Sequence, residues 1–134
     1  MDKSGCVSYK RIAMPWYENA FFYHIYPMGF CGAPARNDFR SEPVERLAKI
    51  IDWIPHLADL GVTAVYLGPV FESVSHGYDT VDYNRVNRRL GTMNTLRRVV
   101  DRLHQRGIQV VLDGVFHQRV DGCFDCHSCW RTKR

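Results

Sequence analysis

No apolar run in this 134-residue chain approaches the ~18 residues that a membrane-spanning helix needs. The opening residues contain neither an apolar segment nor the small-residue cleavage site of a secretory signal. These absences argue against a membrane protein, and we expect a cytoplasmic location. Hydrophobic residues make up 46% of the chain and charged residues 24%, which excludes a disordered or collagen-like chain. The length suits one domain and is too short for two.

A strong excess of one charge is also missing. Lys and Arg number 18 against 14 Asp and Glu, for a formal net charge of +4. Tight basic groupings occur only at Arg88–Arg89, at Arg97–Arg98 and in the last four residues. Nucleic-acid binders concentrate such charge on one face, often interleaved with aromatic residues. We therefore expect no nucleic-acid partner.

The five cysteines do not form a convincing framework. Cys6 and Cys31 are isolated, while the other three, at positions 123, 126 and 129, have C-x-x-C-x-x-C spacing around His127. Three thiolates and an imidazole can bind zinc, but the usual structural site joins two separated ligand pairs, and no second pair is present. In a reducing cytoplasm we expect no disulfides. We interpret residues 119–134 as an unmatched, Cys-rich basic tail, a non-native ending without a metal.

Three segments have the composition of buried strands. Gly61–Gly68 aligns with Gly107–Gly114 at an offset of 46 residues, and each runs through β-branched and apolar residues between two glycines. Such continuous apolar runs suit strands of a parallel sheet that are covered on both faces. The aromatic run Phe21–Tyr26, which ends at Pro27, predicts a first strand.

Two helices are predicted between these strands. Apolar residues recur at steps of three and four from Val44 to Leu60, and Ser41 and Pro43 suit the start of this helix. The second helix is predicted from about Thr92 to Arg106, with Gly107 ending it.

Strands that alternate with helices predict parallel pairing through right-handed crossovers. Long loops follow the strands and short ones follow the helices, as in a (β/α)₈ barrel with its site at the C-terminal ends of the strands. A doubly wound sheet fits the alternation almost as well, but no glycine-rich phosphate-binding motif follows any strand. We predict an α/β fold: the first three strands and two helices of a (β/α)₈ TIM barrel, incomplete because a full barrel needs ~200 residues or more.

Three motifs resemble the α-amylase superfamily (glycoside hydrolase family 13), in the family's order. Trp16–Pro27 resembles its first strand, His76–Tyr83 followed by Arg89–Thr92 resembles the loop after its second strand, and Asp113–His117 resembles its first conserved region. The resemblance covers about residues 16–118, which we assign to a partial barrel catalytic domain. Residues 1–15 are then an N-terminal extension.

The resemblance implies a parent enzyme of carbohydrate metabolism that hydrolyses α-glucosidic bonds in an α-glucan or maltooligosaccharide with retention. This chemistry needs a carboxylate nucleophile and a carboxylic acid about 5 Å apart. In the family these carboxylates follow later strands, which have no counterpart in this sequence. We therefore predict no catalytic residue in this chain and no hydrolysis of glycosides by the chain alone.

Several sugar-contacting positions of the family are retained. Tyr78 matches the tyrosine that stacks on the sugar at the cleavage subsite, and Asp79 matches a position that binds sugar hydroxyls in some members. The alternative for Asp79 is a turn residue. Asp113 matches a mainly structural aspartate whose arginine partner lies on a later strand, so we expect it to be unpaired here.

The end of the third motif departs from the family pattern. Where the family has Asn-His, this sequence has His117 and Gln118. Gln118 can still donate a hydrogen bond to a sugar, and a one-residue shift would bring His117 there instead. The Asn is a calcium ligand in some members and imidazole suits calcium poorly, so we predict no calcium and no other cofactor.

Three functional hypotheses stay open. The first is a truncated α-amylase-type hydrolase that keeps part of the sugar site. The second is one part of a split glycosidase, whose complementary barrel chain would cover the exposed sheet edge. The third is a non-catalytic module that binds sugar through Tyr78 or metal through the cysteine-rich tail.

Overall fold

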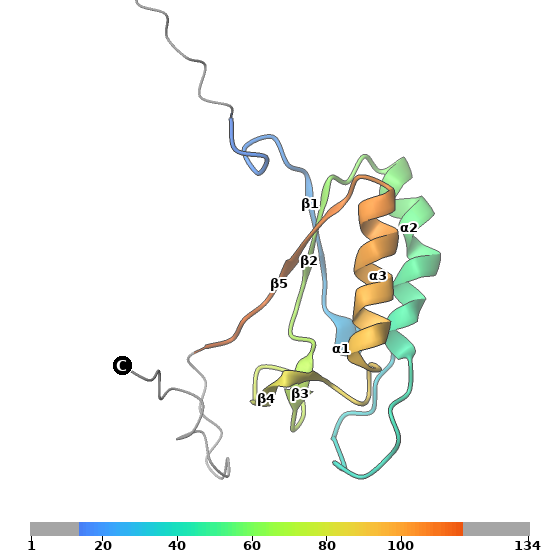
Figure 1. Ribbon diagram of the computed structural model, residues 1–134, viewed down its shortest axis with the longest axis vertical. Helices are drawn as coiled ribbons and strands as arrows, with labels where there is room; N and C mark the ends of the chain where they lie inside the picture. The colour runs from blue at the N-terminus through green and yellow to red at the C-terminus, as the bar shows by residue number, and fades with distance from the viewer. Residues whose placement is uncertain (1–13, 117–134) are drawn as a thin grey trace, which may run out of the picture.

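The computed structural model describes residues 14–116, in which two helices lie against one side of a small sheet (Figure 1). The strands are β1 (Phe22–Ile25), β2 (Ala64–Leu67), β3 (Phe71–Ser73), β4 (Thr80–Val86) and β5 (Gln109–Leu112). The helices are α1 (Pro27–Phe30), α2 (Lys49–Asp59), which follows a 3₁₀ turn at Arg46–Ala48, and α3 (Met93–Gln105). Among these described helices, none is long and apolar enough to cross a lipid bilayer.

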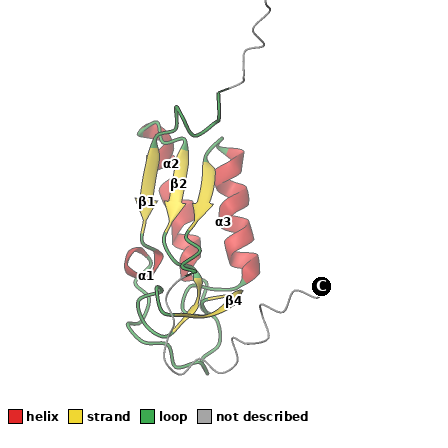
Figure 2. Cartoon of the chain, turned by 90° about the vertical axis from the view of Figure 1, so that its left-hand side faces the viewer, coloured by secondary structure: helices red, strands yellow, loops and turns green. Residues whose placement is uncertain are grey.

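The three predicted strands form one parallel sheet in the order β1-β2-β5. Helix α2 connects β1 to β2, α3 connects β2 to β5, and both helices lie behind the same face of the sheet (Figure 2). A doubly wound sheet has helices on both faces, whereas a (β/α)₈ barrel has them all on the outside. The prediction of an incomplete (β/α)₈ barrel is confirmed, and the described residues do not close into a barrel.

The sheet register carries the stagger that a barrel requires. The sequence repeat aligns Gly61 with Gly107 at an offset of 46, but the paired residues Val65 and Val110 are separated by only 45. In an eight-stranded barrel with a shear of about eight, the strands are tilted. A residue and the residue at the same height on the next strand are therefore shifted by about one position from the hydrogen-bonded register. The offset of 46 in the repeat and of 45 in the ladder differ by this one position.

The core lies between the sheet and the two long helices. Every second strand residue points to the helices, and apolar residues at steps of three and four on each helix face the sheet. The buried residues of this layer include Ile25, Val65 and Leu67 from the strands, Ile50, Ile54 and Leu57 from α2, and Leu96, Val99 and Leu103 from α3. Burial of this kind contributes ~25 cal/mol per Å² of apolar surface, so this layer holds the two helices on the sheet.

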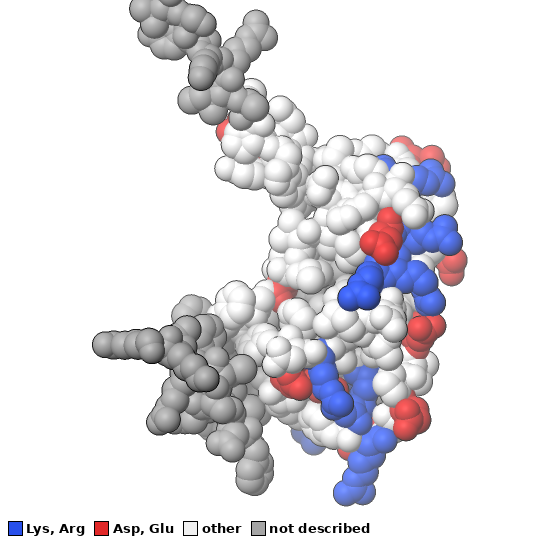
Figure 3. Space-filling model, in the orientation of Figure 1, with Lys and Arg blue, Asp and Glu red and all other residues white. Residues whose placement is uncertain are grey.

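Within residues 14–116, no helix or strand covers the opposite face of the sheet. Phe22 and His24, which alternate with the core residues of β1, are exposed, and the half-buried Tyr66 lies beside His24 with 4.8 Å between ring centroids. Figure 3 shows that charged side chains gather over the helices, whereas the hollowed side formed by the sheet carries few. This uncovered, weakly charged face is the one that points into the lumen of a barrel.

The second helix follows its prediction closely. It begins after Thr92 and ends at Gln105, and a reciprocal capping box joins Thr92 and Thr95. Each hydroxyl accepts from the other residue's backbone N–H, which satisfies two of the unpaired donors at the helix start.

The predicted start of the first helix is wrong. Residues 41–45 are not helical, and Val44 and Leu60, both assigned to the apolar stripe, are 46% and 47% exposed. The backbone N–H of Val44 instead donates to the carbonyl of Arg88 at 2.9 Å, and that of Leu47 donates to Leu90 at 2.8 Å. These tertiary hydrogen bonds hold the segment extended, so α2 begins only at Lys49. It then continues through Pro55 to Asp59.

The three predicted barrel strands are present, but the sequence analysis missed two further strands. The loop after β2 contains an antiparallel pair, β3 and β4, with irregular register at Glu72. The Gly, Asn and Asp residues around this pair hide it from an analysis of hydrophobic periodicity. The hairpin lies below the C-terminal ends of the sheet strands in Figure 1, where it carries the loop that includes Tyr78.

Candidate functional site

Side chains gather where the three parallel strands end. Tyr26 follows β1, Tyr66 lies in β2, and Asp113 directly follows β5. Because the strands are parallel, their C-terminal ends meet at one edge of the sheet. The turn between β3 and β4, residues 74–79, approaches the same edge, since the Tyr26 hydroxyl donates to the carbonyl of His76 at 2.7 Å. We call Tyr26, Tyr66, Tyr78, Asp79 and Asp113 the strand-end cluster.

Asp113 is paired, contrary to the expectation that it would be left without a partner. The Tyr66 hydroxyl donates to its Oδ2 at 2.8 Å, and the backbone N–H of Val115 donates to its Oδ1 at 3.2 Å. Tyr66 pairs with Val111 in the ladder. Asp113 follows Val111 by two residues and therefore lies on the same face of the sheet, where the long side chain of Tyr66 reaches its carboxylate. The hydrogen bond to this carboxylate, followed by burial, raises the pKa of Tyr66.

Asp79 organises its own turn. Its Oδ2 accepts from the Ser75 hydroxyl at 2.6 Å and the Ser75 N–H at 2.8 Å, and its Oδ1 accepts from the Gly77 N–H at 3.1 Å. Burial favours the neutral carboxyl, but the Ser75 hydrogen bonds, a backbone hydrogen bond and the nearby His76 together lower the pKa of Asp79. This pattern favours the alternative in which Asp79 is a turn residue.

Tyr78 lies in that turn as a half-buried ring. Its backbone N–H donates to Nδ1 of His76 at 3.1 Å, and the two rings are 6.1 Å apart. Burial and then the neighbouring Tyr78 raise the pKa of Tyr26, and Tyr78 also contributes to the raised pKa of Tyr66. Three phenol groups therefore share this edge of the sheet. The sequence analysis missed Tyr26 and Tyr66, although each lies in a predicted strand that ends at this edge.

The β3–β4 hairpin is fastened to the end of β5. The Tyr83 hydroxyl donates to the carbonyl of Val115 at 2.6 Å, and its ring stacks on Phe116 with 6.1 Å between centroids. His117 and Gln118, the other predicted sugar-contacting residues, lie outside the described residues, as does the cysteine-rich tail. Between residues 14 and 116, no three His, Cys, Asp or Glu side chains gather as a metal site would require.

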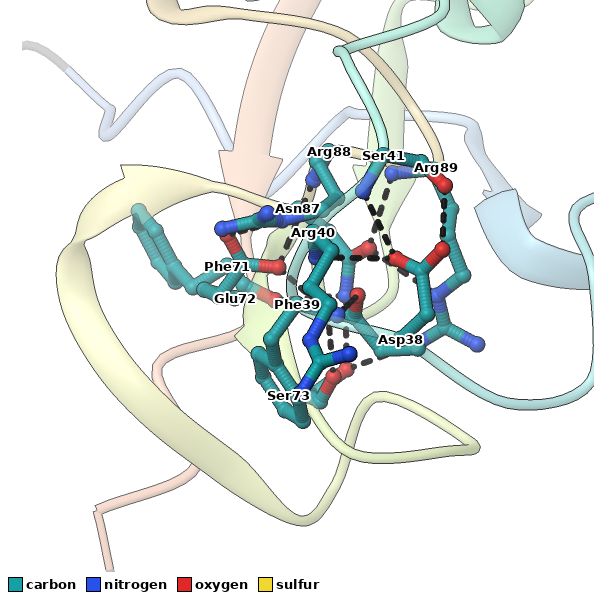
Figure 4. Close-up of polar contacts among 11 residues, drawn as sticks. Asp38, Phe39, Arg40, Ser41, Phe71, Glu72, Ser73, Asn87, Arg88 and Arg89 are labelled. Atoms are coloured by element: carbon teal, nitrogen blue, oxygen red, sulfur yellow. Dashed lines mark hydrogen bonds and ion pairs between the residues drawn. The ribbon is translucent and has the colours of Figure 1, made fainter.

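A buried polar network supports the hairpin from beneath (Figure 4). Glu72 is paired with Arg88 at 3.4 Å and accepts a hydrogen bond from Asn37, while the Asn87 amide donates to the Ser73 hydroxyl at 2.8 Å. Every buried side-chain nitrogen and oxygen among the described residues has a hydrogen-bond partner. Arg89, which the sequence analysis gives no role in the site, is buried in this network.

Acidification tests the role of Asp79. Because its pKa is lowered from the ordinary value of 3.8, its stabilising effect is complete above that pH and is lost as the pH falls through the lowered value. We expect the amide NMR signals of Ser75 and Gly77 to move together below about pH 4. In Asp79→Asn this movement should vanish, and identical titration curves in both proteins would contradict the assignment.

The fold and the strand-end cluster define part of a (β/α)₈ barrel whose site lies at the C-terminal ends of its strands. The family model described as "Alpha amylase, catalytic domain" matches residues 24–125. This match covers most of the chain, and the protein belongs to the α-amylase family.

Individual relatives agree with this assignment. The chain is 38% identical over 116 residues to a cyclomaltodextrinase of a Bacillus species, and the match covers 76% of this chain. It is 33% identical over 122 residues to the intracellular maltogenic amylase of Bacillus subtilis, covering 78% of this chain. The chain spans about a fifth of the length of these curated relatives, 21% and 20% respectively.

A solved structure shows the same arrangement of elements. The ligand-free cyclic α-maltosyl-(1→6)-maltose hydrolase of Arthrobacter globiformis superposes with a TM-score of 0.66 at 33% identity. The superposition covers 81% of this chain and 28% of the hydrolase. The described part of the chain thus corresponds to a limited portion of such an enzyme.

Proposed function

We propose that this chain supplies the sugar-contacting edge of an α-amylase-type glycosidase that acts on α-glucans or maltooligosaccharides with retention. In this proposal residues 16–118 are the barrel portion, and Tyr78 provides the surface on which a glucose ring stacks. The observation that carries the proposal is the strand-end cluster, which places aromatic rings and carboxylates together at the C-terminal edge of a partial barrel. The CH-rich face of a pyranose packs on such a ring while its hydroxyls stay solvated.

The substrate class rests on the relatives. Those described above are named for cyclomaltodextrin, for maltogenic activity and for a cyclic maltosyl-maltose, all built from α-linked glucose. A relative named intracellular also supports a cytoplasmic location for this chain.

Hydrolysis in this proposal requires carboxylates from further strands. Retention needs a nucleophile and an acid about 5 Å apart on opposite sides of the scissile bond. The two carboxylates of the strand-end cluster already accept hydrogen bonds, Asp79 from its own turn and Asp113 from Tyr66. The proposal therefore assigns both carboxylates a structural role and takes the nucleophile and the acid from other strands.

The uncovered face of the sheet supports a requirement for further strands. Phe22 is 44% exposed on this face, and β1 and β5 each pair on one side only within the described residues. In a complete barrel, neighbouring strands pair with the backbone N–H and C=O groups at such edges, and side chains from the other strands fill the space beside the inner face. We include in the proposal that such strands complete the site, whether in the same polypeptide or in a complementary chain.

Titration with maltotriose tests the sugar-contacting role. We expect the purified chain to bind maltotriose without hydrolysing it, and Tyr78→Ala to weaken binding about tenfold, since one aromatic contact is worth about 1.4 kcal/mol. Tyr78→Phe, which keeps the ring, should retain most of the affinity. Isothermal calorimetry gives the dissociation constants, and thin-layer chromatography of a long incubation checks for hydrolysis.

A matched control is available on the helical side. Trp53 on α2 is 36% exposed, contacts the ring of Phe30 edge to face and lies tilted against His56, and it belongs to no part of the strand-end cluster. Trp53→Ala should leave maltotriose affinity unchanged. Equal losses in the Trp53 and Tyr78 variants would place sugar binding elsewhere, and turnover by the wild-type chain would refute the need for further carboxylates.

A further inference from the structure

Arg89 is the most deeply embedded cation of the described chain, and its surroundings are unusual for an arginine. It is only 5% exposed, yet no carboxylate of the described residues lies within ion-pair distance of its guanidinium. A buried charge needs compensating hydrogen bonds, since its desolvation is otherwise costly. Arg89 obtains them from neutral oxygens.

These oxygens come from three separate stretches of the chain. Nη1 donates to the carbonyl of Pro34 at 2.7 Å, and Nη2 donates to the carbonyl of Ser75 at 2.7 Å and to the Ser73 hydroxyl at 3.2 Å. Nε donates to Oδ1 of Asn87 at 3.1 Å, which also fixes the direction of the guanidinium plane. Four of the five donors of the side chain are thus committed. Arg89 links the segment after α1, strand β3 and the turn that carries Tyr78.

The bond to Ser75 is the one that reaches the strand-end cluster. The N–H and hydroxyl of Ser75 both bind the carboxylate of Asp79, which also accepts from Gly77. The turn is held from its other side by the hydrogen bond from Tyr26 to His76. Tyr78 therefore lies in a turn that three distant residues anchor: Arg89 through Ser75, Tyr26 through His76, and Asn37, whose backbone N–H donates to the carbonyl of Val74 at 2.8 Å.

We infer that Arg89 is a positioning residue, which fixes the 74–79 turn and thereby sets the place of the Tyr78 ring at the sugar-contacting edge. This inference rests on the proposed function for its consequence in sugar binding, but not for its effect on Tyr78. A lysine is a poor substitute, because a single ammonium group lacks the planar fork that spans Pro34 and Ser75 at once. Burial lowers the pKa of Arg89, and the nearby carboxylates of Asp79 and Glu72 offset part of this effect.

The neighbouring Arg88 offers a matched control. It belongs to the same network and pairs with the buried Glu72 at 3.4 Å, but none of its hydrogen bonds reaches the 74–79 turn. Arg88→Met therefore disturbs the network without touching the turn. Comparing Arg89→Met with Arg88→Met separates positioning of Tyr78 from general support of the fold.

The experiment reads Tyr78 directly. The full chain is labelled with fluorotyrosine, the Tyr78 resonance is assigned through Tyr78→Phe, and fluorine NMR spectra are recorded well below the thermal midpoint of each variant. We expect the Tyr78 resonance to shift or broaden in Arg89→Met and to stay in place in Arg88→Met. Maltotriose affinity should fall about tenfold in the first variant and stay within about twofold in the second.

Each further outcome has a defined meaning. If Arg89→Met fails to fold, Arg89→Lys decides, with the same displacement of Tyr78 expected at a smaller loss of stability. An unmoved Tyr78 resonance in a folded Arg89 variant would overturn the inference, whatever the affinity. If wild-type chain does not bind maltotriose, the proposed function fails, while the Tyr78 resonance still tests the positioning role.

Discussion

Gly91→Ala is expected to lower the free energy of unfolding by about 2–4 kcal/mol, combining strain at positive φ with damage to a helix cap. Gly91 has φ +142°, and a Cβ built there would lie 2.6 Å from Oγ1 and 2.8 Å from Cβ of Thr95. Thr95 cannot retreat without breaking the capping box with Thr92 and its hydrogen bond to Glu45 at 3.1 Å. Urea denaturation followed by circular dichroism measures the loss.

Gly107→Ala provides the comparison at the other end of α3. Its φ is also positive, +70°, but no heavy atom lies within 4 Å of the added methyl group. Only the backbone cost applies there, about 1 kcal/mol. The additional loss of unfolding free energy in Gly91→Ala measures the collision with Thr95. Equal losses at both glycines would show that the capping box rearranges without a cost in stability.

Asn87→Ala should be almost as damaging, because the fully buried Asn87 is the hub of the polar network beneath the hairpin. Its oxygen accepts from the N–H and Nε of Arg89, both at 3.1 Å, and its amide donates to Ser73 and Phe71. Each buried group left without a partner costs about 1–3 kcal/mol, so we expect a loss of about 3 kcal/mol in total. Thermal and urea unfolding both report this loss.

Asn84→Ala is the control on the same strand. Asn84 is exposed, and its backbone N–H donates to Oδ1 of Asp82 at 2.8 Å. Its removal should change stability by less than about 0.5 kcal/mol, as is usual for surface positions. A loss at Asn87 as small as at Asn84 would mean that water replaces the network without penalty.

Local signals in the sequence were sufficient for the parallel sheet and α3. The two glycine-bounded apolar runs became β2 and β5, and Thr92 and Gly107 bound the second helix closely. The first helix failed where its pattern competed with tertiary contacts. Val44 fits a helical stripe, but its N–H is held by the carbonyl of Arg88, which is 44 residues further along the chain. No local pattern records such a bond.

The site was predictable only where the family motif supplied it. Tyr78, Asp79 and Asp113 were chosen from motifs, yet the partner of Asp113 is Tyr66, which becomes visible only once the sheet register is known. Arg88 and Arg89 were noted as a basic grouping, and Arg89 also as the start of a family-like motif, but neither was expected to be buried. Both are largely buried in the structure. This burial was missed because the β3–β4 hairpin, which contacts them, was not expected from the sequence. Burial of a polar residue depends on distant segments, which composition does not reveal.

The two edge strands of this sheet are parallel to each other, unlike neighbouring strands of an antiparallel sheet. β1 and β5 run in the same direction and pair only towards β2 in the described structure. The outer rim of β5 in one molecule can therefore accept β1 of the next in the same sense, and that copy again leaves a β5 rim free. Such stacking has no two-fold axis to close it. Self-association through these edges would therefore never give a two-fold dimer: it ends where successive copies close a ring, and otherwise it grows by addition as concentration rises.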